Sequence, residues 1–152
     1  MSALHEVTVE ELKARLTLTE VDALPDAVTE GSADDWLASL LLAAANRVVG
    51  ALNACERNAP IAAGLCKVPA ECVNMVLVLA RHSVIASLPG VDLAGTLEGS
   101  ARAAEYQTAV ADLQRLASCE LLPEYTLSDG EGAEGLQGGI TIRARKVPNY
   151  YL

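Results

Sequence analysis

Few residues in this chain combine the types and spacing that catalysis or metal binding requires. His82 lies late in an apolar stretch, and no neighbouring nucleophile or acid is placed to work with it, so we expect no catalytic role. His5 lies in an N-terminal segment that we expect to be frayed. Asp34 and Asp35 could form a metal pair, but adjacent helical residues point about 100° apart. We expect them to complement the positive end of a helix, and we expect neither an enzyme nor a bound metal.

The cysteines are candidates for zinc binding or disulfide formation. Cys55, Cys66, Cys72 and Cys119 lack the paired C-x2-C spacing of a zinc site. The N-terminus also lacks the basic region and apolar run of a signal peptide, which predicts a cytoplasmic protein with reduced thiols. We therefore interpret all four as small core residues. The glycines between 130 and 139 match no phosphate-binding or dinucleotide-binding pattern, so no cofactor is expected.

Charge is distributed unevenly along the chain. Its 152 residues carry a net charge of −9, yet residues 140–152 contain three basic side chains and no acid. The rest of the chain therefore stands at −12. An acidic body argues against binding duplex DNA through its phosphates, although DNA could pass such a surface without sticking. No uncharged run in the helical part is long enough to span a bilayer, so no membrane contact is expected.

Hydrophobic periodicity predicts an all-α protein, a small bundle of about four helices. Aromatic residues make up only 3% of the chain and phenylalanine is absent, so the core must consist of leucine, valine and alanine, which suits close-packed helices. Thr8 and Glu11 match a capping box at the start of the first helix, and Pro25 is expected to end it. Ser32 or Asp34 is expected to cap the second helix. The later helices are expected at 32–56, 70–90 and 101–122.

Two of these helices, 32–56 and 70–90, are apolar nearly all round. The first has only a narrow polar stripe formed by Ser39, Asn46, Gly50 and Asn53. A monomer can hide one such helix at its centre, so the presence of two predicts that one of them is buried against neighbouring subunits. We expect these lateral contacts to use Trp36, Leu40, Val48, Val76, Leu79 and Val84.

The composition changes at residue 123. Residues 123–139 are acidic, glycine-rich and without periodicity, which predicts a flexible linker or a mobile loop. Apolar and polar residues then alternate from 140, as in a short strand. We therefore divide the chain into a helical domain, 1–122, and a linker with an extended C-terminal docking arm, 123–152. The expected docking residues are Ile140, Ile142, Arg143, Arg145, Lys146, Tyr150 and Tyr151.

The order of these parts resembles the small Mu-type phage and prophage family of head-completion, or head–tail connector, proteins. The resemblance covers roughly residues 6–122. Its most specific pieces are "KVPAECVNMVLVLARHSV" at 67–84 and "AEYQTAVADLQRLAS" at 104–118. In the family, the first piece is a "VP" followed by an apolar helix, and the second is a helix that leads out to the tail.

The resemblance implies a structural virion protein that forms a ring, commonly a dodecamer, below the portal in the neck of the particle. DNA would pass through the lumen without specific binding. The implied partners are the portal protein and the tail-completion (stopper) protein, with assembly in the host cytoplasm. A different hypothesis is a small acidic intracellular binding or regulatory module, either a DNA mimic or antitoxin-like, that binds a basic partner.

Overall fold

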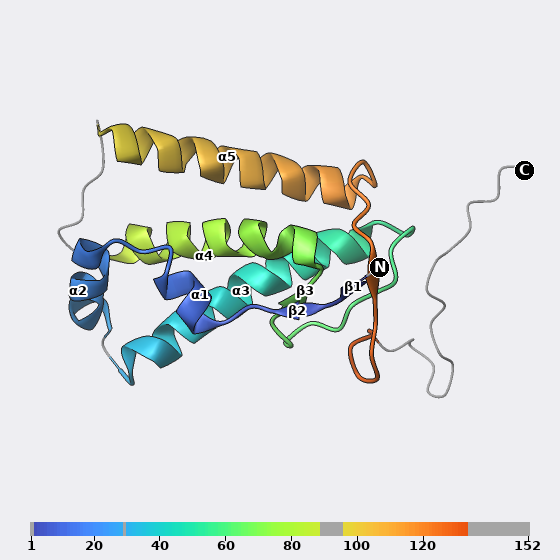
Figure 1. Cartoon of the computed structure of the whole chain (residues 1–152), viewed down its shortest axis with the longest axis horizontal. Helices are drawn as coiled ribbons and strands as arrows, with labels where there is room; N and C mark the ends of the chain where they lie inside the picture. The colour runs from blue at the N-terminus through green and yellow to red at the C-terminus, as the bar shows by residue number, and fades with distance from the viewer. Residues whose placement is uncertain (1, 29, 89–95, 134–152) are drawn as a thin grey trace, which may run out of the picture.

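The computed structural model describes residues 2–28, 30–88 and 96–133, except for the side chains of residues 26 and 27 (Figure 1). Most of these residues are helical, so the predicted all-α bundle is confirmed. The helices are α1 Val9–Lys13, α2 Leu18–Ala27, α3 Ala33–Ala54, α4 Val73–Ser87 and α5 Leu97–Ala117, and a 3-10 turn, η1 Ala70–Cys72, leads into α4. Helices α3, α4 and α5 each contact the other two, α1 packs on α3 and α4, and α2 lies at one end of the bundle (Figure 1).

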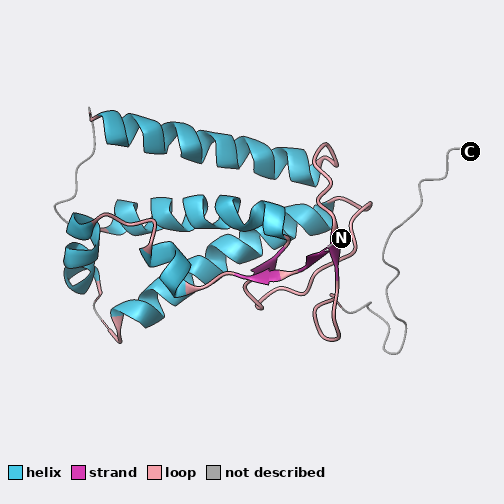
Figure 2. Ribbon diagram, in the orientation of Figure 1, coloured by secondary structure: helices cyan, strands magenta, loops and turns pink. Residues whose placement is uncertain are grey.

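Two pairs of very short strands fasten the N-terminal segment to the opposite end of the bundle (Figure 2). β1 Ser2–Ala3 pairs in parallel with β4 Tyr125–Thr126. β2 His5–Glu6 pairs antiparallel with β3 Lys67–Val68. The expectation of a frayed segment around residue 5 is therefore wrong, because its backbone is paired with segments distant in the sequence.

Capping boxes start the first two helices. The Thr8 hydroxyl accepts from the Glu11 backbone N–H at 3.3 Å, and the Glu11 carboxylate accepts from the Thr8 N–H at 2.8 Å, as expected. A second capping box, formed by Thr17 and Glu20, starts α2. The single first helix expected from the sequence is thus two helices. Pro25 lies inside α2 and does not end it, although its missing N–H removes one helical hydrogen bond.

The start of α3 agrees with the sequence. The Ser32 hydroxyl accepts a hydrogen bond from the Asp35 backbone N–H at 3.1 Å, so Ser32 is the capping residue. Asp34 and Asp35 lie in the first turn, where the helix dipole favours negative charge. Asp34 also forms an ion pair with Lys13 of α1 at 2.5 Å, which ties the two helices together.

Helix α4 is the buried centre of the bundle. It lies against α3, α5 and α1, and its exposed residues are confined mainly to its ends. Its buried residues are Met75, Val76, Leu77, Val78, Leu79, Ala80, Arg81 and Val84. This helix is therefore covered within a single chain. It is the one apolar helix that a monomer can hide at its centre, so any burial against neighbouring subunits falls to the other apolar helix, α3.

Residues 123–133 belong to the helical domain. The Tyr125 hydroxyl donates to the Ala59 carbonyl at 2.5 Å, and the Glu131 carboxylate pairs with the Lys67 ammonium at 2.9 Å. The predicted linker is thus part of the fold up to residue 133, and the domain boundary at residue 122 is wrong. The predicted strand and the docking residues from Ile140 to Tyr151 lie outside the described residues.

A buried ion pair fastens α2 to α5. Only 1% of the Glu20 side chain is exposed, and its carboxylate accepts hydrogen bonds from the Arg102 guanidinium and, at 2.7 Å, from the Thr17 N–H. The same guanidinium pairs with Glu98, whose side chain is 50% exposed, at 3.0 Å. Glu20 therefore both accepts a capping hydrogen bond at the start of α2 and anchors the first half of α5.

Replacing Glu20 with glutamine should lower the free energy of unfolding by about 2 kcal/mol, because it removes the buried charge that balances Arg102. Glutamine retains the capping acceptor, so this loss reports on the ion pair. The matched control Glu98→Gln removes a solvent-exposed partner and should cost less than about 1 kcal/mol. Urea unfolding followed by circular dichroism measures both. Equal losses in the two variants would contradict the assignment of Glu20 as the anchor.

Candidate functional site

The six residues expected to make lateral contacts divide into two groups. Val48, Val76 and Val84 are fully buried and Leu79 is 3% exposed, all within the core of the single chain. These four side chains pack between the chain's own helices, so their assignment to contacts between subunits is corrected. The other two, Trp36 and Leu40, are partly exposed near the start of α3 and pack against the edge of the core.

The uncovered part of α3 is its outer face, which we call the open α3 face and define as Ser39, Ala43, Arg47, Gly50 and Ala54. All five are exposed, and Arg47 is the only charged member. A Cβ atom added to Gly50 would meet no atom within 4 Å. Glycine inside a helix costs about 1 kcal/mol relative to alanine, and no contact within the described chain requires it here. The open α3 face is therefore a small, nearly uncharged surface.

Two residues of the polar stripe of α3, Asn46 and Asn53, form hydrogen bonds with the loop between α3 and β3. The Asn53 side-chain amide donates to the Ile61 carbonyl and accepts from the Ile61 N–H, both at 2.8 Å. The Asn46 side-chain oxygen accepts from the Gly64 N–H at 2.9 Å. Both asparagines are exposed, but their side-chain amides already bind the chain's own loop.

The two large hydrophobic side chains that are well exposed in the described part of the chain both start helices. Leu18 is 77% exposed at the start of α2, and Leu97 is 92% exposed at the start of α5. Neither residue was singled out in the sequence. The only signal there is an apolar residue directly after the capping threonine, at Thr17 and Thr96.

His82 joins α4 to α5 through an aromatic contact. Its ring stacks on that of Tyr106, with centroids 3.7 Å apart and planes 13° from parallel. Partial burial, followed by the positive charge of Arg47, lowers the pKa of His82 below its usual value. One residue earlier, Arg81 pairs with Glu105 of α5 at 2.5 Å. Both contacts hold helices together.

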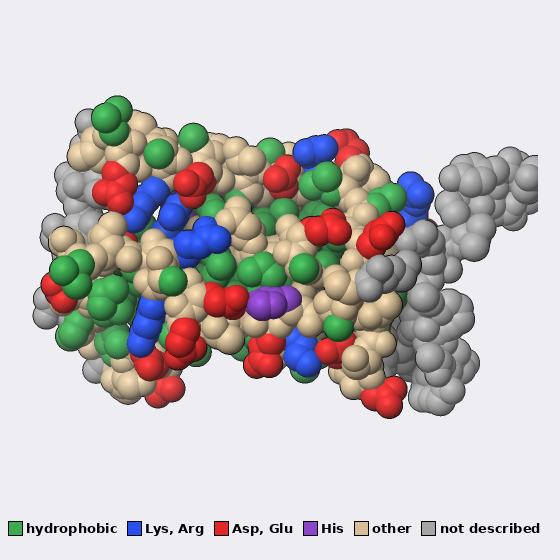
Figure 3. All heavy atoms as spheres, in the orientation of Figure 1, with side chains coloured by type: hydrophobic (Ala, Val, Ile, Leu, Met, Phe, Trp, Pro, Cys, Tyr) green, Lys and Arg blue, Asp and Glu red, His purple; other side chains and the backbone are tan. Residues whose placement is uncertain are grey.

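No group of three or more histidine, cysteine or acidic residues within the described ranges could hold a metal ion. His5 instead contacts the Glu11 carboxylate at 2.8 Å. The N–H of Thr8, and to a lesser extent His5, lowers the pKa of Glu11. Figure 3 shows acidic and basic side chains interspersed on one face of the molecule. A DNA mimic would concentrate acids on one face, and this face does not.

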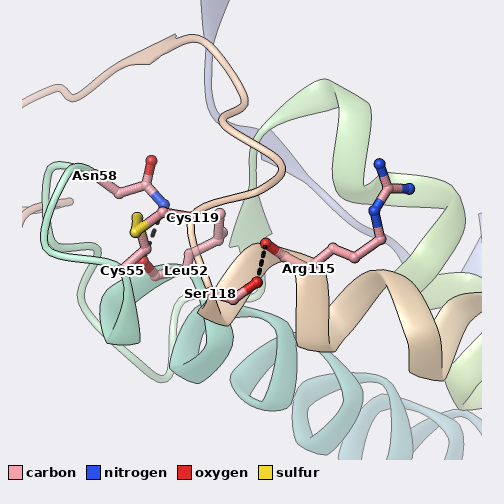
Figure 4. Close-up of a disulfide and its surroundings, with 6 residues drawn as sticks. All are labelled: Leu52, Cys55, Asn58, Arg115, Ser118 and Cys119. Carbon is pink, nitrogen blue, oxygen red and sulfur yellow. Dashed lines mark hydrogen bonds between the residues drawn. A yellow bond between two sulfur atoms is a disulfide. The ribbon is translucent and has the colours of Figure 1, made fainter.

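A disulfide joins Cys55 to Cys119, with their Cα atoms 5.2 Å apart (Figure 4). The expectation of four reduced cysteines is wrong for this pair. Local sequence could not reveal the pairing, because it depends on the C-terminal ends of α3 and α5 meeting in space. Cys66 and Cys72 are free. Burial raises the pKa of the Cys72 thiol to about 12, and burial followed by the charge of Glu6 raises that of Cys66.

Cys119 occupies a position that usually belongs to glycine. Its φ of 66° is left-handed, and it lies just after α5. The Cys119 N–H donates to the Leu116 carbonyl at 3.2 Å, and the Glu120 N–H donates to the Arg115 carbonyl at 2.8 Å. These bonds form a Schellman motif, in which glycine is favoured because it has no Cβ. Cys119 adopts this conformation at a steric cost, and its sulfur forms the disulfide with Cys55.

Two segments, Ala33–Ala54 and Ala70–Ser87, are long and apolar enough to cross a membrane by length and composition. Both are partly buried inside the bundle, which is typical of core helices in soluble proteins as well. Length and composition therefore do not distinguish a membrane span from a core helix of a soluble protein.

No protein-family model, curated protein or solved structure matches this chain.

Under reducing conditions, Cys119→Gly should raise the free energy of unfolding by about 1 kcal/mol relative to the wild-type chain, because glycine adopts a positive φ without steric cost. The matched control Cys119→Ala keeps a Cβ and should stay within about 0.5 kcal/mol of the reduced wild type. Urea unfolding in excess dithiothreitol measures all three chains without a disulfide. If glycine and alanine gave equal stability, residue 119 would not be left-handed in the reduced protein.

Proposed function

We propose that this protein is a head–tail connector of a phage or prophage particle, a structural adaptor without a catalytic step. The open α3 face carries the proposal. A long helix keeps an uncovered, nearly uncharged surface with Gly50 at its centre, although glycine there weakens the isolated helix. Such a surface suits the close approach of another helix.

A ring requires two different surfaces that meet in every neighbouring pair of subunits. Heterologous contacts of this kind close into a ring when the rotation between subunits permits. The outer side of α5 offers a counterpart to the open α3 face, because Ala101, Ala104, Thr108 and Ala111 are small, uncharged and exposed. We therefore assign lateral contact in the proposed dodecamer to α3 of one subunit and α5 of the next.

The order of the helices adds support from the family resemblance. Two short capped helices, α1 and α2, precede the long apolar α3, a loop ending in Val68-Pro69 follows, and then come the apolar α4 and the long α5. Under the proposal, the −12 charge outside residues 140–152 repels DNA and allows it to slide through the lumen. The protein would be made in the host cytoplasm and act in the neck of the virion, between the portal and the tail-completion protein.

The C-terminal arm would make the contact with the portal. The last described residue, Ala133, donates its N–H to the Pro60 carbonyl at 3.0 Å, close to the C-terminal end of α3. The chain therefore continues from this end of the bundle toward the basic and aromatic residues of 140–152. Under the proposal, the arginines and Lys146 meet an acidic surface, and Tyr150 and Tyr151 enter an apolar pocket.

Gly50→Leu should abolish ring formation and leave the monomer folded, because the added side chain enters open space in the monomer but blocks a close neighbour. The matched control Gly50→Ala should raise monomer stability by about 0.5–1 kcal/mol and still assemble. Light scattering after size-exclusion chromatography, and negative-stain microscopy with cognate portal, measure assembly. Normal rings from the leucine variant would exclude the open α3 face as the lateral contact.

Deleting residues 140–152 should leave helical content by circular dichroism almost unchanged and abolish binding to the cognate portal. The full chain is the control in both measurements. Loss of folding would instead assign these residues to the domain core. A full-length chain that stays monomeric and never binds portal would contradict the connector proposal and favour the acidic binding module.

A further inference from the structure

The Cys55–Cys119 disulfide is the covalent tie between the C-terminal ends of two helices. Cys55 caps the end of α3 and is 1% exposed, whereas Cys119 is partly exposed in the turn after α5. The two cysteines are 64 residues apart in the sequence. We propose that this disulfide is a thiol-reducible switch: the oxidised chain holds the turn at residues 118–121 against the end of α3, and reduction lets the turn open more often, although the closed turn stays its main conformation. The inference does not depend on the proposed function.

The hydrogen bonds of this turn run back to α5 itself, and Leu121 packs against the edge of the core. The N–H groups of Glu120 and Leu121 both donate to the Arg115 carbonyl, at 2.8 and 3.1 Å. The Ser118 hydroxyl donates to the same carbonyl at 3.3 Å (Figure 4). The two backbone bonds from Glu120 and Leu121 require the left-handed conformation of Cys119, which a non-glycine residue adopts only at a cost. Without the bond to Cys55, the turn loses its covalent restraint, while the steric cost of the left-handed conformation at Cys119 remains.

The difference in exposure determines how the disulfide is reduced. A thiolate of an external thiol, such as glutathione, attacks the sulfur of Cys119, the more exposed residue of the pair, and Cys55 leaves as a thiolate that takes a proton. A second external thiol then attacks the mixed disulfide and frees Cys119 as its thiol. One protein disulfide and two external thiols become two protein thiols and one external disulfide, a transfer of two electrons. An external disulfide reverses both steps.

The free thiols of Cys66 and Cys72 do not exchange with the Cys55–Cys119 disulfide. Cys72 is 2% exposed and Cys66 is partly buried. Because their raised pKa values leave almost no thiolate at neutral pH, neither attacks the disulfide at a useful rate. Reoxidation therefore restores the same pair. The switch closes where thiols are oxidised and opens where a cell keeps them reduced.

Hydrogen–deuterium exchange with mass spectrometry tests the switch on the full chain. In the oxidised protein, the amides of Cys119, Glu120 and Leu121 should exchange at rates comparable to those of α4. After reduction with dithiothreitol, these amides should exchange about tenfold faster, or more, than those of α4. A uniform acceleration of both regions would overturn the proposal, because it would mean that the disulfide contributes only to global stability.

Two variants complete the test. Cys55→Ser should show the fast exchange at 118–121 with or without dithiothreitol. Cys66→Ser retains the disulfide and should respond to dithiothreitol as the wild-type chain does. Alkylation with iodoacetamide before reduction reports whether the bond is formed. Modification of both Cys55 and Cys119 in the protein treated with oxidised glutathione would also overturn the proposal.

Discussion

The fold depends on the need to surround α4. This helix is apolar on nearly every side, so water must be excluded along most of its length, and α3, α5 and α1 together achieve this. Even Arg81, 9% exposed on this helix, has its charge balanced by Glu105 of α5. Because α3 needs only one side to cover α4, a helix with few charges is left with an uncovered outer face. The arrangement that completes the core therefore also leaves the open α3 face uncovered.

Helix α5 contributes least to the apolar core and is fastened by other means. Its buried residues are Ala109, Leu113 and Leu116, all in its second half. The first half is held by the ion pair between Arg102 and Glu20, and the far end by the disulfide. The ion pair thus compensates for sparse hydrophobic burial in the first half, and the disulfide adds a covalent link at the better packed far end. The two contacts respond to different conditions, since only the disulfide depends on the redox state.

Features coded by neighbouring residues were predictable, and features that join distant segments were not. The Thr8–Glu11 capping box and the extent of α3 follow from local spacing, and the overlooked box at Thr17 carries the same signature. The disulfide and the packing of residues 123–133 depend on which helix ends meet, which periodicity does not encode. The small residues of the open α3 face were visible in the sequence. Their exposure follows from α4, and not α3, being the central helix, which the two similar apolar patterns do not determine.

The pairing of the N-terminus with residues near the other end of the domain has a consequence for biosynthesis. Strand β1 begins at Ser2, and its partner β4 ends at Thr126. During translation, α1, α3 and α4 can pack as soon as they leave the ribosome, but β1 must wait until almost the whole domain has been made. Closure of this long-range pair is therefore expected to be a late folding step. It occurs only once α5 has been synthesised, so a truncated nascent chain cannot complete it.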